Sequence, residues 1–288
     1  MFFLAKTTHF GYICRMILRA NCKINIGLDV LRRREDGFHE LSTVMFPVRE
    51  LYDPVTVEQS ENLTFTQTGI AVDCPVEKNL CVRAARLMQK CYGVGNVAIE
   101  LDKRVPFGAG LGGGSSDAAY MIRLLDERFR LNIGNAEMER YAARLGADCA
   151  FFITAEPSFA SGIGNVLEPV EGPQQALEGC YIVVVKPDVA VSTRDAYSKI
   201  TPRQPQKCCR DIVRQSIETW RNELVNDFEQ PVFALYPQLA EIKEKLYSLG
   251  AVFALMSGSG SALFGIFRHN PEGIDAAFPD CATFIERL

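Results

Sequence analysis

The stretch "PFGAGLGGGSSDAA", residues 106–119, places five glycines within seven positions and follows them with two serines. Glycine loses much backbone entropy on folding, so a loop this rich in it indicates a backbone that must pass where a side chain cannot. Residues 97–103 alternate as a strand does, and the residues after the loop have helical spacing. A glycine loop between a strand and a helix favours anion binding, because the helix N-terminus has unpaired N–H groups and a partial positive charge.

Simpler phosphate-loop motifs do not account for this stretch. Gly108, Gly110 and Gly113 satisfy G-x-G-x-x-G, but no apolar strand with an acidic end follows, as a dinucleotide-binding unit requires. A Walker loop needs a lysine where this chain has Ser115, and the protein-kinase signatures H-R-D and D-F-G do not occur. A plain surface turn is the remaining alternative, and the loop's length and its direct entry into a helix argue against it.

Composition limits the classes of partner. The 288 residues are 48% hydrophobic and carry a net charge of -4, which argues against a broad basic surface for nucleic acid. No apolar run reaches the length of a membrane span, so we expect no membrane partner. The ten cysteines and three histidines show no zinc spacing. Cysteines such as Cys81, Cys91 and Cys149 are expected to be small buried hydrophobic residues in a reducing cytoplasm.

The length favours two domains. Recognisable pattern begins only at Leu18, so we expect residues 1–15 to be a dispensable extension and Met16 to be a candidate start. We expect one domain over 16–172 and another over 173–288. Expected strands are 18–30, 55–59, 63–67, 97–103, 181–187 and 282–288, and expected helices are 79–92, 115–129 with a serine cap, 137–146 and one from about Pro237; 199–215 is expected to be a loop, and 251–267 a strand, glycine turn and strand.

The full glycine string resembles the phosphate loop of the GHMP kinases, the superfamily of galactokinase, homoserine kinase, mevalonate kinase and phosphomevalonate kinase. Two further motifs of that superfamily match here: "KIN" at 23–25 and "SGSGSALFG" at 257–265. The resemblance implies an α+β, two-domain fold. Its N-terminal nucleotide domain would be like domain 2 of ribosomal protein S5, and its C-terminal domain a ferredoxin-like α/β sandwich.

Three segments narrow the resemblance within the superfamily. The segments 23–41, 77–87 and 145–153, "KINIGLDVLRRREDGFHEL", "EKNLCVRAARL" and "LGADCAFFI", resemble the member that phosphorylates a cytidine diphosphate-linked methylerythritol in the non-mevalonate isoprenoid pathway. Departures are Cys22 for alanine, Phe38 for tyrosine, and Cys149-Ala150 for Val-Pro. The alternatives are a sibling kinase acting on homoserine or mevalonate, and a binding protein that has lost catalysis.

The resemblance implies an ATP- and Mg²⁺-dependent transfer of the γ-phosphoryl group to a substrate hydroxyl, giving the 2-phosphate and ADP. It assigns Asp148 as the base and Lys23 as the cation that keeps it ionised. From the residues alone, Asp148 could equally be a loop carboxylate or a helix cap, and Lys23 a strand lysine facing solvent. The expected partners are a small-molecule substrate and, at most, a weak homodimer partner; a monomer is the alternative.

Two further sets of residues follow from the same resemblance. From the residues alone, Lys103 could be a solvated strand end instead of a phosphate contact, and Asn79 could be a helix cap instead of an adenine-side contact. Ser115 or Ser116 could cap the helix instead of contacting Mg²⁺. The expected ATP-binding residues are Asn79, Lys103, Pro106, Gly108, Gly110, Leu111, Gly112, Gly113, Gly114, Ser115 and Ser116. The expected substrate-side residues are Asn25, Phe38, His39, Tyr197, Asp227, Gly258 and Gly260, with His39 and Tyr197 beside the cytosine base.

Overall fold

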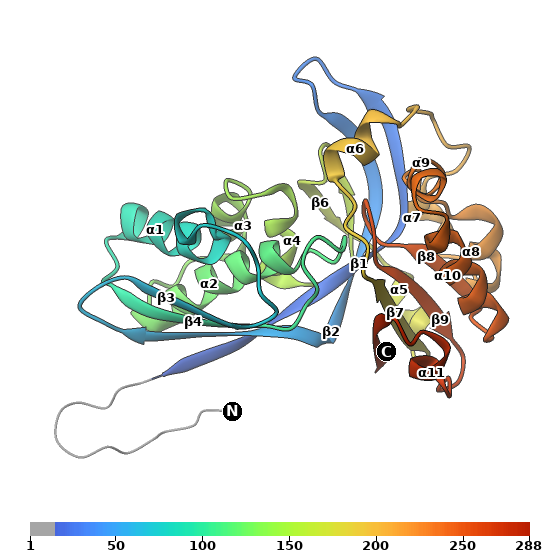
Figure 1. Ribbon diagram of the computed structural model, residues 1–288. Helices are drawn as coiled ribbons and strands as arrows, with labels where there is room; N and C mark the ends of the chain where they lie inside the picture. The colour runs from blue at the N-terminus through green and yellow to red at the C-terminus, as the bar shows by residue number, and fades with distance from the viewer. Residues whose placement is uncertain (1–14) are drawn as a thin grey trace. The chain divides into compact units, whose positions relative to one another are not determined.

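The computed structural model describes residues 15–288, and the chain in it divides into two compact units (Figure 1). Each unit is assembled from separate segments of the chain. The first unit takes residues up to 22, 52–107 and 112–155, and the second takes 23–51, 108–111 and 156–288. The domain boundary at 172/173 stays a prediction, and the expected extension lies, apart from Arg15, outside the described residues. Within residues 15–288, no helix has the length and apolar character to cross a membrane.

The chain is α+β, as expected, and its first two strands are long. β1 (Met16–Arg33) pairs with β2 (His39–Gln59), and each contributes residues to both units. The first part of β2 was not predicted as a strand. Residues 41–48 are all buried, so they lack the alternation of polar and apolar side chains that marks a strand with one exposed face.

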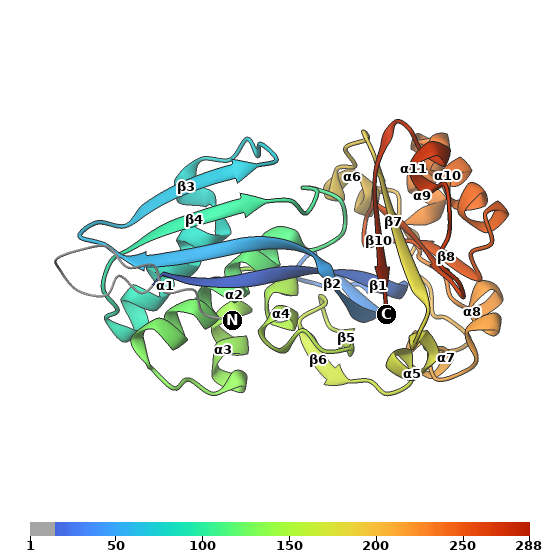
Figure 2. The same cartoon turned by 90° about the horizontal axis from the view of Figure 1, so that it is seen from below.

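In the first unit, helices cover one face of a group of strands (Figures 1 and 2). β4 (Val97–Lys103) pairs antiparallel with the end of β2 and parallel with β3 (Thr64–Gly69). The helices are α1 (Leu80–Tyr92), α2 (Gly113–Phe129), α3 (Asn135–Ala142) and α4 (Phe151–Thr154), with 3-10 turns η1 (Val76–Lys78) and η2 (Ala147–Cys149).

The start of α2 corrects the sequence expectation. Its N-cap is Gly112 at φ +73°, with no side-chain cap, so Ser115 and Ser116 lie inside the first turn instead of capping it. The left-handed conformation at Gly112 turns the chain into the helix, which is why a glycine stands at this position. The cysteine expectation was also wrong in one case, because Cys91 is exposed.

The second unit contains a four-stranded antiparallel sheet in the order β10-β7-β9-β8. Figure 2 shows α8 and α10 on one side of this sheet. The strands are β7 (Tyr181–Pro187), β8 (Phe253–Met256), β9 (Leu263–Phe267) and β10 (Cys281–Arg287), and β5 (Ser158–Ser161) and β6 (Val166–Pro169) extend from β2. The helices are α5 (Pro173–Leu177), α6 (Thr193–Ser198), α7 (Cys209–Ile212), α8 (Ile217–Glu223), α9 (Glu229–Leu235), α10 (Pro237–Ser248) and α11 (Ile274–Ala277).

Two local expectations in this unit need correction. The segment 199–215 is not wholly a loop, because α7 forms within it. The helix expected from about Pro237 is preceded by a separate helix, α9. The helical conformation is interrupted at Tyr236, and Pro237 begins α10. Proline favours the first helical position and disfavours a helical residue before it, which explains the break.

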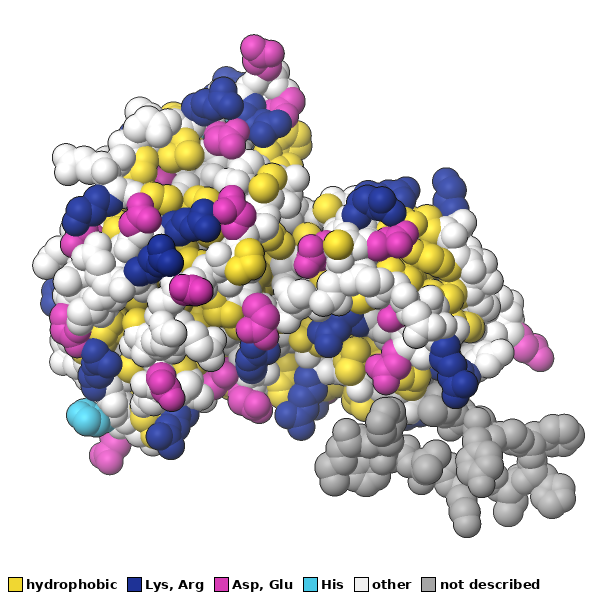
Figure 3. All heavy atoms as spheres, turned by 180° about the vertical axis from the view of Figure 1, so that it is seen from behind, with side chains coloured by type: hydrophobic (Ala, Val, Ile, Leu, Met, Phe, Trp, Pro, Cys, Tyr) yellow, Lys and Arg dark blue, Asp and Glu magenta, His cyan; other side chains and the backbone are white. Residues whose placement is uncertain are grey.

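Charged side chains of both signs are intermingled on the face shown in Figure 3. No broad area of one sign stands out on that face, in keeping with the net charge of -4.

Candidate functional site

Lys23 is a buried cation at the middle of β1, with 3% of its surface exposed. Its ammonium donates to Asn25 Oδ1 over 2.5 Å and to the Gly110 carbonyl oxygen over 2.8 Å. Its backbone N–H donates to the Leu111 carbonyl over 3.0 Å, and Asn25 in turn donates to Thr43 Oγ1 over 2.9 Å. Lys23 is therefore not a strand lysine facing solvent, and it is bonded directly to the glycine loop.

The glycine turn after β8 packs on the same part of the loop. Ser257 Oγ donates to the Gly110 carbonyl over 2.9 Å, and the Ala262 N–H donates to the Ala109 carbonyl over 3.1 Å. A Cβ on Gly110 would lie 1.9 Å from the Ser257 carbonyl oxygen, and one on Gly258 would lie 3.2 Å from Gly110. Bare backbone is needed here because two protein segments meet. Within the second unit, residues 23–25, 108–111 and 257–260 are thus brought together.

Asn226 holds the glycine turn, and the sequence did not single it out. Its Nδ2 donates to the Met256 and Gly258 carbonyls over 2.7 and 2.8 Å, and its Oδ1 accepts the Phe228 N–H over 2.9 Å. The side chain is 3% exposed and uses both its donors and its acceptor. No spacing or motif in the sequence marks an asparagine for this role.

Asp227, the expected substrate-side residue, is bonded to its own chain. Its Oδ2 accepts the Val30 N–H over 2.8 Å, and its Oδ1 accepts from Arg203 Nε over 2.9 Å. Burial, and then the charge of Asp227, raises the pKa of the nearby Asp29 carboxyl to about 7. Asp227 therefore contributes to the structure around β1 whether or not it contacts a substrate.

In the first unit, Lys103 lies between two buried carboxylates. Its ammonium donates to Asp117 Oδ2 over 2.8 Å and to Asp53, and it is 2% exposed. Asp53 Oδ1 also accepts the N–H groups of Arg104 and Val105, over 2.5 and 2.7 Å. Asp53 thereby fixes the backbone just before the glycine loop. No sequence motif marks Asp53 for this role, since it lies in a different segment of the chain from the loop.

The charge balance of this cluster is uneven, with one ammonium for two carboxylates. Burial raises the pKa of Asp117 to about 8; the Lys103 charge opposes the shift and the Asp53 charge adds to it. Asp117 Oδ1 and Ser116 Oγ are buried and have no hydrogen-bond partner among residues 15–288. Buried polar atoms of this kind are uncommon in proteins, so these two at the start of α2 are candidates for contact with a ligand or ion.

The glycines of the loop face different surroundings. A Cβ on Gly113 would lie 2.9 Å from Lys103 Nζ. A Cβ on Gly108 would have no atom within 4 Å, and one on Gly114 would meet only Leu80 Cδ1, at 3.9 Å. Open space therefore adjoins the backbone at Gly108 and Gly114. The N-terminal N–H groups of α2 beside Gly114 are those that an anion would use.

Asp148 lies in η2 and is half-buried. The turn packs beside the start of α2: a Cβ on Gly146 would lie 3.2 Å from Cys149 Sγ and 3.8 Å from Ser115 Oγ. Asn79 caps α1 by accepting the Cys81 N–H over 2.9 Å, so its capping role is observed and its adenine-side role stays a prediction. Pro106 is half-buried at the loop's entry, next to Phe107, which is 63% exposed.

The residues expected to bind the cytosine base form an aromatic cluster in the second unit. The rings of His39 and Tyr197 stack with centroids 5.0 Å apart, and Tyr197 meets Phe228 edge-on at 4.8 Å. Burial, and then the Arg33 charge, lowers the pKa of His39. Phe38 is 59% exposed. Because the two rings are in contact, they form one continuous surface, not the two walls of a slot.

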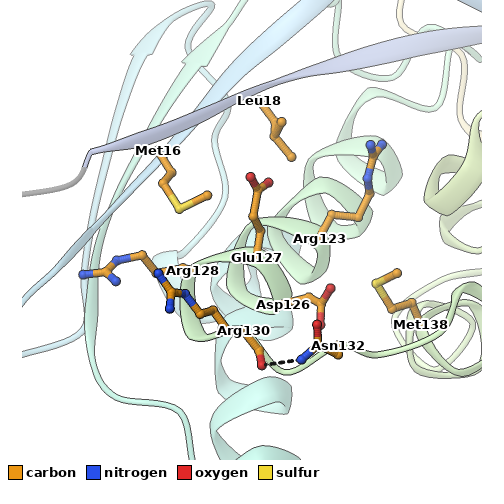
Figure 4. Close-up of a pocket in the computed structure, with 9 residues that line it drawn as sticks. All are labelled: Met16, Leu18, Arg123, Asp126, Glu127, Arg128, Arg130, Asn132 and Met138. Atoms are coloured by element: carbon orange, nitrogen blue, oxygen red, sulfur yellow. Dashed lines mark hydrogen bonds between the residues drawn. The ribbon is translucent and has the colours of Figure 1, made fainter. Parts of the chain in front are cut away.

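A pocket of about 780 Å³ elsewhere in the first unit contains none of the expected site residues (Figure 4). It lies at the C-terminal end of α2, the end away from the glycine loop, and Asn132 Nδ2 there donates to the Arg130 carbonyl over 3.0 Å. Among residues 15–288 no group of three or more histidine, cysteine, aspartate or glutamate side chains could hold a metal ion.

Comparison with known families identifies the class. Residues 79–156 match the GHMP kinases N terminal domain, and residues 210–278 match the GHMP kinases C terminal domain. A homoserine kinase structure from Cytophaga hutchinsonii, 16% identical with a TM-score of 0.68, shares the fold. Both halves of the chain thus define a GHMP kinase.

More similar relatives narrow the family. A protein of Bacteroides fragilis named 4-diphosphocytidyl-2-C-methyl-D-erythritol kinase is 46% identical over 88% of this chain and 92% of the relative. One of the same name from Parabacteroides distasonis is 45% identical over 92% of this chain and 97% of its own. A crystal structure of 4-(cytidine 5'-diphospho)-2C-methyl-D-erythritol kinase is 33% identical with a TM-score of 0.79, covering 94% and 98% of the two chains. The chain belongs to the 4-diphosphocytidyl-2-C-methyl-D-erythritol kinase family of GHMP kinases.

Proposed function

We propose that this protein transfers the γ-phosphoryl group of ATP to a hydroxyl of 4-diphosphocytidyl-2-C-methyl-D-erythritol, giving the 2-phosphate and ADP. The observation that carries the proposal is the identity of 45–46% to relatives with that name over about nine-tenths of the chain. The buried Lys23 bonded to the glycine loop is the arrangement that phosphoryl transfer can use, since this chemistry depends on positioning and charge neutralisation.

The glycine loop is the proposed ATP phosphate site. Open space at Gly108 and Gly114, and the N-terminus of α2 beside Gly114, suit the oxygens of a polyphosphate. The Lys103 ammonium is already paired with Asp53 and Asp117, so we assign Lys103 a positioning role at the start of the loop. Direct phosphate contact by Lys103 would require it to exchange one of these carboxylates for the phosphate.

Asp148 is the proposed general base. It accepts the proton of the substrate hydroxyl, whose oxygen then forms a bond to the γ-phosphorus while the bond to the ADP oxygen breaks. Lys23 supplies a positive charge that stabilises the oxygen as its proton leaves. Both Lys23 hydrogen bonds fix the ammonium in place, so little reorganisation is needed when charge develops.

Mg²⁺ is the proposed metal cofactor, and Ser116 is its candidate protein contact. Its buried hydroxyl lacks a hydrogen-bond partner within residues 15–288, and Mg²⁺ accepts hard oxygen ligands. When bound with ATP, Mg²⁺ neutralises charge on the phosphate oxygens.

We further propose that the protein acts in the cytoplasm, as a monomer or weak homodimer. The nine described cysteines are all free thiols, as in a reducing compartment.

A substrate panel tests the proposal. The purified protein would be given Mg-ATP with 4-diphosphocytidyl-2-C-methyl-D-erythritol, homoserine or mevalonate, and ADP release and the phosphorylated product would be measured. We expect phosphorylation of the cytidine compound with a kcat/KM at least about 10³ above the other two. Higher kcat/KM for homoserine or mevalonate would identify a sibling kinase, and ATP binding without transfer to any of the three would identify a binding protein.

A further inference from the structure

Asn226 lies in the segment between α8 and α9, and its backbone is tied to β1. The Leu28 N–H donates to the Val225 carbonyl over 2.8 Å, and the Asp227 N–H donates to the Leu28 carbonyl over 2.9 Å. These two bonds flank Asn226 in the sequence. Its side chain is therefore held at a fixed place relative to the strand that carries Lys23.

The partners of the Asn226 amide define a single orientation for it. Nδ2 donates to the carbonyl oxygens of Met256 and Gly258, and Oδ1 accepts the Phe228 N–H. Rotating the amide by half a turn would set Oδ1 against the two carbonyl oxygens and Nδ2 against an N–H group. Asn226 is 3% exposed, so loss of its Nδ2 would leave these carbonyls short of a donor away from water.

A second side chain from the same segment supports the end of β8. Glu229 Oε1 accepts the Met256 N–H over 2.9 Å, and Glu229 Oε2 accepts from Lys243 over 2.6 Å. Met256 is thus bonded through both its N–H and its carbonyl, and Gly258 through its carbonyl. The short segment 225–229 therefore joins β1 to the end of β8 and to the glycine turn.

Gly258 lies against two groups that accept from the Lys23 ammonium. A Cβ on Gly258 would lie 3.2 Å from Gly110 Cα and from its carbonyl oxygen, and 3.5 Å from Asn25 Oδ1. The Gly110 carbonyl and Asn25 Oδ1 are both acceptors for Lys23 Nζ. A shift of Gly258 would therefore displace an acceptor of the ammonium.

We propose that Asn226 is a positioning residue for phosphoryl transfer, which fixes the Gly258 carbonyl and thereby sets the place of the Lys23 ammonium on the glycine loop. Asn226 acts through the turn and needs no contact with ATP or the substrate. The inference rests on the proposed function, because it concerns turnover in that reaction. A displacement of about 1 Å at a reacting centre can lower turnover by about a hundredfold, so a remote side chain can have a large effect.

Asn226→Asp tests the role with little change of shape. The carboxylate can still accept the Phe228 N–H, but it has no donor for the Met256 and Gly258 carbonyls and repels them. We expect kcat to fall by roughly tenfold to a hundredfold and the KM for ATP to change by less than about threefold, because the open space at Gly114 does not depend on Asn226. A folded variant with the kcat of the parent would overturn the proposal.

Asn226→Ser removes both donor bonds without adding a negative charge, so it replaces Asn226→Asp if that variant does not fold. It should lower kcat in the same way. Tyr247→Phe is the matched control, because the Tyr247 hydroxyl donates to the Ala254 carbonyl over 3.2 Å and accepts the Ala254 N–H over 3.1 Å. Its loss weakens β8 away from the turn. The thermal midpoint should fall in every variant, but kcat only in those at Asn226. An equal fall of kcat in Tyr247→Phe would identify lost stability as the cause and would refute the positioning role.

Ser257→Ala shows whether Asn226 acts through the turn. Ser257 lies between the two carbonyls that Asn226 holds, and its hydroxyl donates to the Gly110 carbonyl over 2.9 Å. Ser257→Ala should lower kcat less in the Asn226→Ser background than in the parent, because the contact with Gly110 is already weakened there. The same factor in both backgrounds would mean that the two residues act separately, contrary to the proposal.

Hydrogen exchange measures the positioning without any activity. The Ala262 N–H donates to the Ala109 carbonyl over 3.1 Å, and the Gly260 N–H donates to the Ser257 carbonyl over 3.0 Å. We expect residues 257–262 to exchange at least about tenfold faster in Asn226→Ser, with β7 unchanged. Exchange at the rate of the parent would refute the role of Asn226. Failure of the parent to phosphorylate any of the three alcohols would instead refute the proposed function.

Discussion

The Lys23 ammonium and the Ser257 hydroxyl both donate to the Gly110 carbonyl oxygen, over 2.8 and 2.9 Å. A single backbone oxygen of the glycine loop thus joins β1 to the turn after β8 within the second unit. Lys23 therefore provides a positive charge and also links β1 to the glycine loop through a hydrogen bond. Removing its ammonium should affect turnover and stability by different amounts, because Ser257 remains on Gly110.

Lys23→Met should therefore reduce turnover far more than it reduces folding. Loss of a positioned charge at the reacting oxygen lowers turnover by about 10²–10³. Asn25 Oδ1 loses its charged partner, which lowers the free energy of unfolding by about 1–3 kcal/mol. Steady-state kinetics and thermal unfolding measure the two effects. Lys90→Met, at an exposed lysine of α1, is the control and should change neither. Near-normal turnover in folded Lys23→Met would remove Lys23 from the reaction.

Asp148→Asn tests the proposed base. The amide keeps the shape of the side chain but cannot accept the hydroxyl proton, so turnover should fall by about 10²–10⁴ while ATP still binds. Single-turnover kinetics and an ATP-binding titration measure the two quantities. Asp73→Asn, at an exposed carboxylate of the same unit, should behave as the unmodified protein does. If Asp148→Asn retains most of its turnover, another group accepts the proton.

Gly114 and Gly110 form a matched pair for the loop. A Cβ at Gly114 meets open space and alanine favours a helix over glycine by about 0.5–1 kcal/mol, so Gly114→Ala should fold at least as stably as the parent. Its methyl group enters the proposed phosphate space, and we expect ATP affinity to fall about tenfold or more. Unchanged ATP affinity would show that the phosphates lie elsewhere.

Gly110→Ala should give the opposite result. Its Cβ would lie 1.9 Å from the Ser257 carbonyl oxygen, and φ there is +76°, so the protein itself must move. A marked drop in the thermal midpoint is expected, and ATP binding should be lost mainly through folding. Gly112 is less informative, because its φ of +73° makes any side chain strained whether or not ATP binds nearby.

Asp117→Asn should flatten the dependence of stability on pH. The folded-state pKa of Asp117 is raised to about 8, so between about pH 4 and 8 the folded chain holds a proton that the unfolded chain has released. Stability therefore falls as pH rises through this window, by up to about 1.4 kcal/mol per pH unit. The asparagine cannot lose a proton and should show a smaller fall. Thermal midpoints from pH 6 to 9 measure the difference, and parallel curves would contradict the raised pKa.

The motifs were predictable because each is local in sequence. The run "GAGLGGGSS" and the residues around Lys23 carry their chemistry within a few positions, and β4 was predicted to the residue. The helix α1 was predictable because Asn79 begins it and Gly93, at φ +64°, ends it. These are signals that a single segment contains by itself.

The supporting residues were not predictable, because their roles depend on distant partners. Asp53 acts on the backbone of Arg104, 51 positions away, and Asn226 acts on Met256, 30 positions away. The reason for Gly110 was also hidden, since the Ser257 backbone and not only a ligand excludes a side chain there. A sequence shows that glycine or asparagine is present, but the partner that requires it appears only in the fold.

The last prediction concerns the choice of a cytidine-bearing substrate. His39 and Tyr197 form one stacked surface with centroids 5.0 Å apart, and we expect the cytosine base to lie against it. Base–aromatic stacking contributes about 1–3 kcal/mol, which corresponds to roughly tenfold to hundredfold in KM. His39→Ala and Tyr197→Ala should each raise the KM for the cytidine substrate by that factor and leave the KM for ATP nearly unchanged. Tyr197→Phe keeps the ring and should restore most of the affinity.

Selectivity for cytosine over uracil needs hydrogen bonds as well, because a mismatched polar group would be left unpaired. Burial lowers the pKa of His39, so its ring is neutral at pH 7 and offers one donor and one acceptor to the edge of the base. Phe38 is 59% exposed and lacks a hydroxyl, so Phe38→Tyr should be nearly neutral. His39→Ala should therefore lose discrimination against the uridine analogue, whereas Tyr197→Ala should lose affinity for both analogues equally. If both alanine variants bind the cytidine substrate normally, or if ATP affinity falls in parallel, the base lies elsewhere on the protein.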